Sequence, residues 1–142
     1  MKETVALTAL QLASFGLLYV LSRTAFSDVY VLDWTAHNYY LYLWIPVILL
    51  SIFQKTILSL SLTIGNLFGI LLGQILGDMI RLSNMQKITE MMTEGQKYQL
   101  LSHPGVFIWI FTILGFLALG EIASLIHQRK VRAVISNNAM PI

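Results

Sequence analysis

The sequence contains no cysteine and few charged residues. Of its 142 residues, 11% are Asp, Glu, Lys or Arg, whereas a soluble domain usually has about a quarter of its residues charged. The missing cysteine excludes disulfide bonds and thiolate chemistry. The net charge of +2 is too small for a nucleic-acid-binding surface, which needs Lys and Arg concentrated on one face. These shortages together indicate a membrane protein that does not bind nucleic acid.

Sequence motifs for nucleotide binding, hydrolysis and metal binding are also missing. We find no P-loop, dinucleotide-binding fingerprint, HExxH, GxSxG or cysteine-based metal motif, so we expect no enzyme, no cofactor and no metal. One alternative is a membrane-surface enzyme that uses Asp33 and His37, four residues apart, with Asp28 and His103. Two such residues in a loop are usually solvated, and we therefore favour a non-enzymatic protein.

Long apolar runs dominate what is present, since 56% of the residues are hydrophobic. A membrane helix needs roughly 20 mostly apolar residues, because the hydrocarbon layer is about 30 Å thick and a helix rises about 1.5 Å per residue. The first run has a weakly charged start and no small-residue cleavage site, so we interpret it as a retained span. The sequence predicts an all-α integral membrane protein, a single domain over residues 1–142, with four transmembrane helices at 4–22, 39–53, 57–80 and 105–126 and a tail at 127–142.

The second and third spans come from one nearly continuous apolar stretch. Residues 39–80 would form a helix about twice the membrane thickness, so the chain must fold back. The break predicted best is Gln54-Lys55-Thr56, which contains a full charge; a weaker alternative is 59–63. The second span is short and contains Pro46, which is tolerated in membrane helices but frees a carbonyl group.

Four spans place both termini on the same side of the membrane. Arg129, Lys130 and Arg132 lie directly after the last span, and cationic residues in that position favour the cytoplasmic side. The tryptophans and tyrosines fall at or near the opposite face, where amphipathic rings prefer the headgroup layer. The sequence therefore predicts a multi-pass protein of a bacterial-type plasma (inner) membrane with both termini in the cytoplasm.

The two predicted outer segments differ in character. Residues 23–38 are polar and aromatic, and we interpret them as a loop. Residues 81–104 contain Thr93 and Gln96 at capping-box spacing, and Pro104 ends any helix before it. We expect a short interfacial helix there, lying on the headgroups with its apolar side down.

A row of small residues runs along the third span. The row has one small residue every four positions and comprises Ser61, Gly65, Gly69, Gly73 and Gly77. Each glycine costs roughly 1 kcal/mol of helix propensity in water, and in lipid the compensation is close approach of another helix. The row predicts a glycine-zipper-like groove in tight contact with a helix. It leaves open whether that helix is the first span, the fourth span, another copy or a different protein.

A row of polar residues lies beside the groove, about 100° round the helix. It contains Asn66, Gln74 and Asp78, and an amide without a partner costs several kcal/mol in hydrocarbon. We favour a structural role, in which Asn66 makes an interhelical hydrogen bond and Asp78 pairs with Arg81. The functional alternative is a polar pathway that also includes Glu121 of the fourth span, although Glu121 is close enough to the surface to pair with Lys55.

Three hypotheses of function follow. The first is a subunit or accessory protein of a membrane complex that packs through the glycine groove against itself or another membrane protein. The second is a small oligomeric transporter or channel whose path is lined by Asn66, Gln74 and Glu121. The third is the membrane-surface enzyme described above. All three place the chain in contact with the lipid bilayer.

Overall fold

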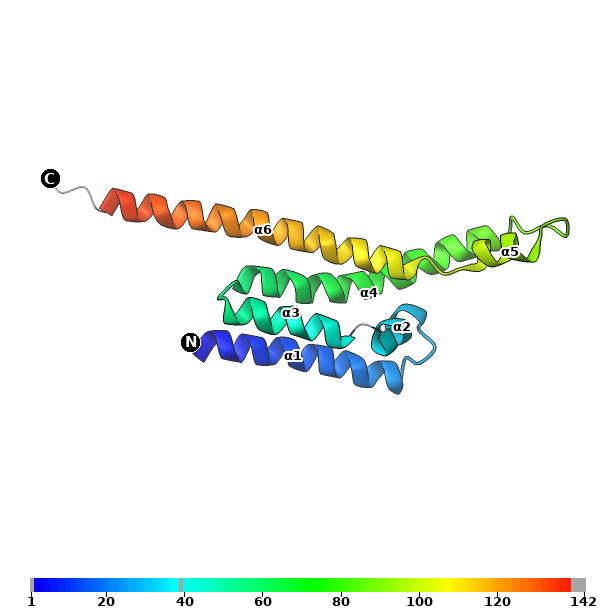
Figure 1. Ribbon diagram of the computed structural model, residues 1–142, viewed down its shortest axis with the longest axis horizontal. Helices are drawn as coiled ribbons and strands as arrows, with labels where there is room; N and C mark the ends of the chain where they lie inside the picture. Colours follow the sequence, from blue (N-terminus) through cyan, green and yellow to red (C-terminus); the bar gives the residue numbers. More distant parts are fainter. Residues whose placement is uncertain (1, 39, 139–142) are drawn as a thin grey trace.

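The computed structural model describes residues 2–38 and 40–138, and this part of the chain forms six α-helices (Figure 1). Tyr39, with which the second predicted span begins, and residues 139–142 of the predicted tail lie outside the described residues. The helices are α1 (Lys2–Arg23), α2 (Tyr30–Asn38), α3 (Tyr40–Ile52), α4 (Thr56–Met85), α5 (Glu94–Leu101) and α6 (Gly105–Asn138).

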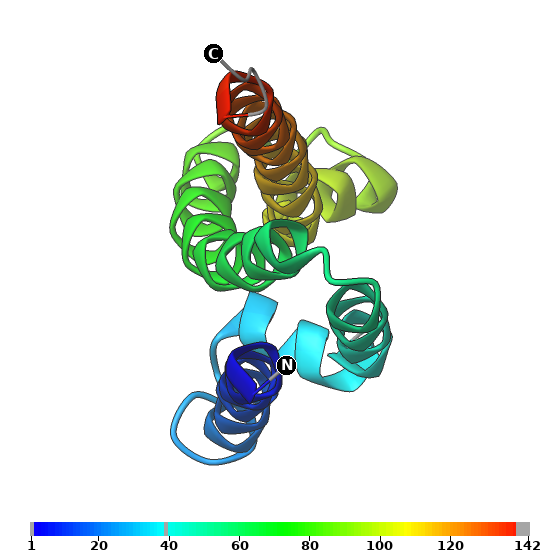
Figure 2. The same ribbon diagram turned by 90° about the vertical axis from the view of Figure 1, so that its left-hand side faces the viewer.

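The four longer helices lie side by side with alternating chain direction. The neighbouring pairs are α1 with α3, α3 with α4, and α4 with α6 (Figures 1 and 2). Short α2 lies at one end of this bundle, in contact with α1, α4 and α6. At the same end α4 continues past the bundle and leads into α5, whereas α6 extends past the opposite end (Figure 1). We call residues 79–101 the arm.

Three helices of the described chain are long and apolar enough to cross a membrane, namely α1, α4 and α6. The predicted second span is the exception. Helix α3 has 13 residues, about 20 Å at 1.5 Å per residue, which is shorter than a hydrocarbon layer of about 30 Å. The structure thus supports an all-α protein with three candidate membrane spans and one shorter apolar helix between them.

The turn between α3 and α4 lies where the charged residue Lys55 predicted it. Gln54 has a φ of 55°, in the left-handed region that often ends a helix. The Gln54 and Lys55 amides donate to the carbonyl oxygens of Ser51 and Leu50 at 3.0 and 2.8 Å. This pair of bonds is a Schellman motif, which satisfies the last carbonyl groups of α3. The alternative break at 59–63 is wrong, because those residues are inside α4.

The interpretation of residues 23–38 as a loop is wrong for its second half. Residues 30–38 form α2, which buries Val31, Leu32, Thr35 and Ala36. These positions repeat at helical spacing and make one apolar face, while Asp33 and His37 face outwards and are partly exposed. The overall polarity of the segment hides this amphipathic pattern.

The second outer segment contains the predicted short helix. Thr93 caps α5: its side chain accepts a hydrogen bond from the Gln96 amide, and the Gln96 side chain accepts one from the Thr93 amide. Both halves of a capping box are therefore present. The helix buries none of its residues against the described part of the chain.

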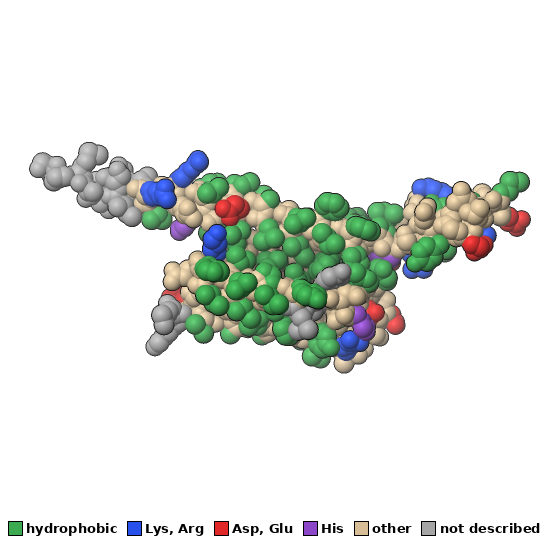
Figure 3. Space-filling view, in the orientation of Figure 1, with side chains coloured by type: hydrophobic (Ala, Val, Ile, Leu, Met, Phe, Trp, Pro, Cys, Tyr) green, Lys and Arg blue, Asp and Glu red, His purple; other side chains and the backbone are tan. Residues whose placement is uncertain are grey.

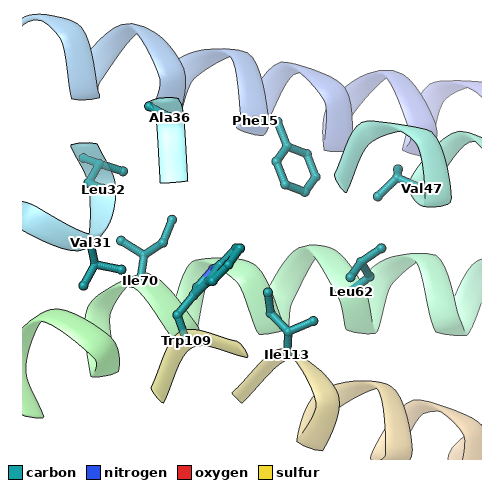
Figure 4. Packing of buried hydrophobic residues seen from close by; sticks show 9 residues of the cluster. All are labelled: Phe15, Val31, Leu32, Ala36, Val47, Leu62, Ile70, Trp109 and Ile113. Atoms are coloured by element: carbon teal, nitrogen blue, oxygen red, sulfur yellow. The ribbon is translucent and has the colours of Figure 1, made fainter. Parts of the chain in front are cut away.

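Buried apolar side chains from five helices meet in one core (Figure 4). Trp109 and Ile113 of α6 lie near Leu62 and Ile70 of α4, and Phe15 of α1 points towards them. The outer surface of the bundle is also largely apolar (Figure 3). A soluble monomer rarely exposes so large an apolar area, so the surface is consistent with contact with a lipid bilayer.

Candidate functional site

The glycine row of α4 lies against α6. A Cβ atom added at Gly73 would be 2.6 Å from the carbonyl oxygen of Gly105, and one added at Gly65 would be 2.8 Å from the Cβ of Phe116. Real Cβ atoms essentially never come that close to other heavy atoms. The two helix backbones are therefore in direct contact along this row.

The other positions of the row are also in close contact with α6 or with His103, which lies just before it. A Cβ at Gly69 would be 2.9 Å from Cδ1 of Trp109, and Gly77 lies against the His103 ring. At the other end, the Cβ of Ser61 is 2.7 Å from the position that a Cβ on Gly120 would occupy. Small residues on both helices thus allow the approach.

The helix in the groove belongs to the same chain. The sequence left four partners open, and the structure places α6 there, the fourth predicted span. The groove is filled along its length, so it is not free to receive another copy or a different protein. A role in assembly must therefore use some other surface of the molecule.

Asn66 makes an interhelical hydrogen bond. It is 1% exposed, and its Oδ1 accepts from Nε1 of Trp109 at 2.9 Å. This is the type of contact that the structural interpretation of the polar row requires. The Asn66 Nδ2 group is buried and has no partner among the described residues. A role for Asn66 in a polar pathway stays a prediction.

Gln74 and Asp78 belong to a chain of hydrogen bonds at the end of the bundle near α2. The Val31 amide donates to Gln74 Oε1 at 3.0 Å, and Gln74 Nε2 donates to Asp78 Oδ2 at 2.7 Å. Nε2 of His103 lies 3.2 Å from Asp78 Oδ1, and the Gly105 amide donates to His103 Nδ1 at 3.1 Å. We call these five groups the polar chain.

Each hydrogen bond of the polar chain can be assigned a donor and an acceptor without conflict. Because Nδ1 of His103 accepts a hydrogen bond from the Gly105 amide, a neutral His103 carries its proton on Nε2, and this N–H donates a hydrogen bond to Asp78. The Val31 and Gly105 amides are in the first turns of α2 and α6, where backbone donors have no partner within their helix. The Asp78 carboxylate thus binds Gln74 and His103, and these two side chains accept hydrogen bonds from the N-terminal amides of α2 and α6.

The predicted ion pair between Asp78 and Arg81 is wrong. Among the described residues, the partners of the Asp78 carboxylate are Gln74 and His103. The spacing of three residues in α4 made Arg81 the nearest candidate in the sequence. Residue 103 lies 25 positions further on, and a single sequence carries no signal that would bring it to Asp78.

A cleft of about 560 Å³ adjoins the polar chain. It lies between α2, the base of the arm and the first turns of α6. The Tyr30 ring packs against the His103 ring with 4.4 Å between the centroids and an angle of 35° between the ring planes, which fixes one wall. Side chains that line the cleft include Tyr30, Trp34, Arg81, Tyr98, His103 and Phe107.

The residues of the predicted enzyme cluster have different partners. His37 Nδ1 lies 3.0 Å from Asp33 Oδ1, and its Nε2 lies 2.6 Å from Nη1 of Arg23, in an exposed position. His103 instead bonds to Asp78. Asp28 is exposed in the turn before α2. The described residues contain no group of three or more His, Cys, Asp or Glu that could hold a metal ion.

Glu121 and Lys55 are both exposed. No ion pair joins them among the described residues, where the carboxylates that form ion pairs are Asp33, Asp78 and Glu94. Glu121 follows Trp109, the partner of Asn66, by twelve residues or about 18 Å of helix. The proposed path through Asn66, Gln74 and Glu121 stays a prediction.

A second buried polar cluster was missed by the sequence analysis. Ser59 Oγ donates to Gln11 Oε1 at 2.7 Å, and Ser51 Oγ lies 3.4 Å from Ser59 Oγ. Gln11 is 3% exposed, and its Nε2 has no partner in the part of the chain that the structure describes. The available signal was an amide in the middle of the first apolar run, since polar residues inside membrane spans are rare and usually face protein.

Comparison with protein-family models, curated proteins and solved structures gives no match. The fold itself defines the class: an all-α chain in which three long apolar helices have the length and composition of membrane spans. These properties are those of a small multi-pass membrane protein.

Proposed function

We propose that this chain is a non-enzymatic subunit of a larger membrane assembly, in a plasma membrane of bacterial type, and that the arm is its contact with the partner. The supporting observation is the methionine content of the arm. Four of the six methionines lie within residues 79–92, and Met79, Met85 and Met91 are exposed. Methionine side chains are flexible and polarizable, which suits adaptable binding surfaces.

The length of α4 supports a position of the arm outside the hydrocarbon layer. Lys55 precedes α4, and a layer of about 30 Å corresponds to about 20 helical residues. Counted from Thr56, the apolar layer ends near Ile75, and α4 continues to Met85. The exposed apolar side chains of the arm therefore lie beyond the length that lipid tails would cover.

The charges of the arm favour a protein partner over the lipid surface. Helices that lie on membranes usually carry many Lys and Arg residues on their polar face. The arm contains three cationic residues and two acidic ones, and Lys97 pairs with Glu94 at 3.0 Å. A nearly balanced surface with exposed methionines is a poor membrane anchor, and we therefore place a protein against it.

Photo-crosslinking from the arm tests this proposal. We expect a photoreactive amino acid at Met91, which is 98% exposed, to form an adduct with one membrane protein, identified by mass spectrometry. The matched control is the same group at Phe111, which is 70% exposed on the apolar part of α6 and should react with lipid. Lipid adducts alone at Met91 would mean that the arm lies on the membrane surface, contrary to the proposal.

Transport is a second candidate, because three buried N–H donors in the described part of the chain have no acceptor there. They are Nε2 of Gln11, Nε1 of Trp44 and Nδ2 of Asn66, and each costs free energy in a dry interior. Water or an uncharged polar solute would supply acceptors. Since the chain has no cysteine, a Gln11→Cys variant can be probed with a membrane-impermeant thiol reagent, with lipid-exposed Leu10→Cys as the control. Labelling of the Gln11→Cys variant alone would support transport, and no labelling would exclude a wet path at this depth.

A further inference from the structure

The cleft beside the polar chain contains an arginine that has no ion-pair partner among the described residues. Arg81 and His103 are its two basic lining residues, and both ring nitrogens of His103 are already hydrogen-bonded, to Asp78 and Gly105. Among the described residues, no carboxylate forms an ion pair with Arg81. An anion in the cleft would therefore meet a free guanidinium group.

The depth of Arg81 matches a layer of lipid headgroups. Arg81 follows Lys55 by 26 residues, about 39 Å of helix, and a bilayer with its headgroups measures about 40–45 Å. When Lys55 lies in one headgroup layer, Arg81 lies in the other. The rings of Tyr30 and Tyr98 line the same cleft, and such amphipathic rings prefer this layer.

The lining of the cleft contains both polar and apolar groups. Arg81 and Tyr98 supply hydrogen-bond donors, whereas Val106 and Phe107 lie on the first turn of α6. Phe107 is exposed, and α6 continues from it towards the apolar middle of the bundle. A molecule with an anionic head and a hydrocarbon tail fits this combination of groups.

We propose that the cleft binds the phosphate-bearing headgroup of a membrane lipid. The Arg81 guanidinium group donates to the phosphate oxygens, and the first part of an acyl chain lies along Phe107. The planar guanidinium group matches phosphate geometry with two parallel hydrogen bonds. This site goes beyond the proposed function, because it attaches the base of the arm to lipid whether or not the arm contacts a partner.

Lipid binding to the full chain, measured by native mass spectrometry from detergent, tests the site. The probes are phosphatidylglycerol and diacylglycerol, which share their acyl chains but differ in the phosphate. The variants are Arg81→Gln and, as a matched control, Lys87→Gln on the exposed part of the arm outside the cleft. We expect the wild type and Lys87→Gln to retain phosphatidylglycerol, Arg81→Gln to bind it about tenfold more weakly, and diacylglycerol to be lost. Equal melting temperatures would show that both variants are folded.

Three results would overturn the proposal. Equal retention of phosphatidylglycerol by Arg81→Gln would show that the guanidinium group does not hold it. Equal retention of diacylglycerol would show that binding is apolar only. Displacement of the lipid by millimolar inorganic phosphate, with the same dependence on Arg81, would assign the site to a soluble anion. An Arg81→Lys variant should bind with intermediate affinity, because it keeps the charge and loses the paired donors.

Discussion

At the scale of single residues, the absence of a side chain sets the distance between α4 and α6. The backbone oxygen of Gly105 lies 2.6 Å from the position of a Cβ added at Gly73, whereas no described atom beyond its own stretch of helix lies within 4 Å of a Cβ added at Gly115. Both glycines are inside helices, so they have the same intrinsic cost. The two glycines differ in the atoms that surround a Cβ added to each. The same substitution at both positions therefore isolates the effect of the contact with α6.

We predict that Gly73→Ala destabilises the folded protein by about 1–3 kcal/mol, the usual cost of overpacking. The clash is with backbone, which cannot rotate away as a side chain could. Gly115→Ala should be neutral or more stable by up to about 1 kcal/mol, as expected from helix propensity. Unfolding in mild detergent measures both variants. Equal effects at the two positions would contradict the close contact at Gly73.

The hydrogen bond from Trp109 to Asn66 leads to a second prediction at this scale. Trp109→Phe removes the donor and leaves both polar atoms of Asn66 buried without a partner, at a cost of about 1–3 kcal/mol. Adding Asn66→Leu should recover part of this loss, because replacing both partners by apolar groups is often nearly neutral. A double-mutant cycle on the unfolding free energy measures the coupling. Strictly additive effects would show that the bond contributes nothing.

At the scale of elements, the polar chain holds α2, α4 and the start of α6 together. Gln74 is the part that reaches α2, because its Oε1 accepts from the Val31 amide and its Nε2 donates to Asp78. Helix α2 has nine residues, which is too short to be stable alone in water. Its order therefore depends on its buried face and on this bond.

We predict that Gln74→Leu loosens α2 while leaving α4 intact. The Val31 amide loses its acceptor, so amide hydrogen exchange across residues 30–38 should become faster. Exchange mass spectrometry measures this, with Gln99→Leu on exposed α5 as the control. Unchanged exchange in α2 would show that its apolar face alone holds it in place.

The predictions from the sequence agree best with the structure where a local feature depends on residues that are close together in the chain. The turn at Gln54-Lys55-Thr56 was predictable, because a full charge in the middle of a long apolar run is energetically costly. The α5 cap was predictable because Thr93 and Gln96 are close in the chain. The role of α2 and the partners of Asp78 were not, since they depend on segments far apart in the sequence. The glycine row predicted a close helix contact, and only the structure identifies the helix as α6.

At the scale of the whole molecule, α4 and α6 form a pair of long helices that run past the bundle at opposite ends (Figure 1). Their shared surface carries the buried glycines, the bond between Asn66 and Trp109 and the contact between Gly73 and Gly105. The other helices lie against this pair. The position of the arm and of the cleft therefore depends on the contact between α4 and α6 within a single chain.

A disulfide between these two helices tests that contact most directly. The chain has no cysteine, so the double variant Ser61→Cys with Gly120→Cys contains a single possible pair. The Cβ positions of these residues lie 2.7 Å apart, and a small shift reaches the separation of about 3.8 Å found in disulfides. We predict that mild oxidation in membranes gives a linked monomer on non-reducing gels, with the joined peptides identified by mass spectrometry. A disulfide-linked dimer, or no bond at all, would contradict the account.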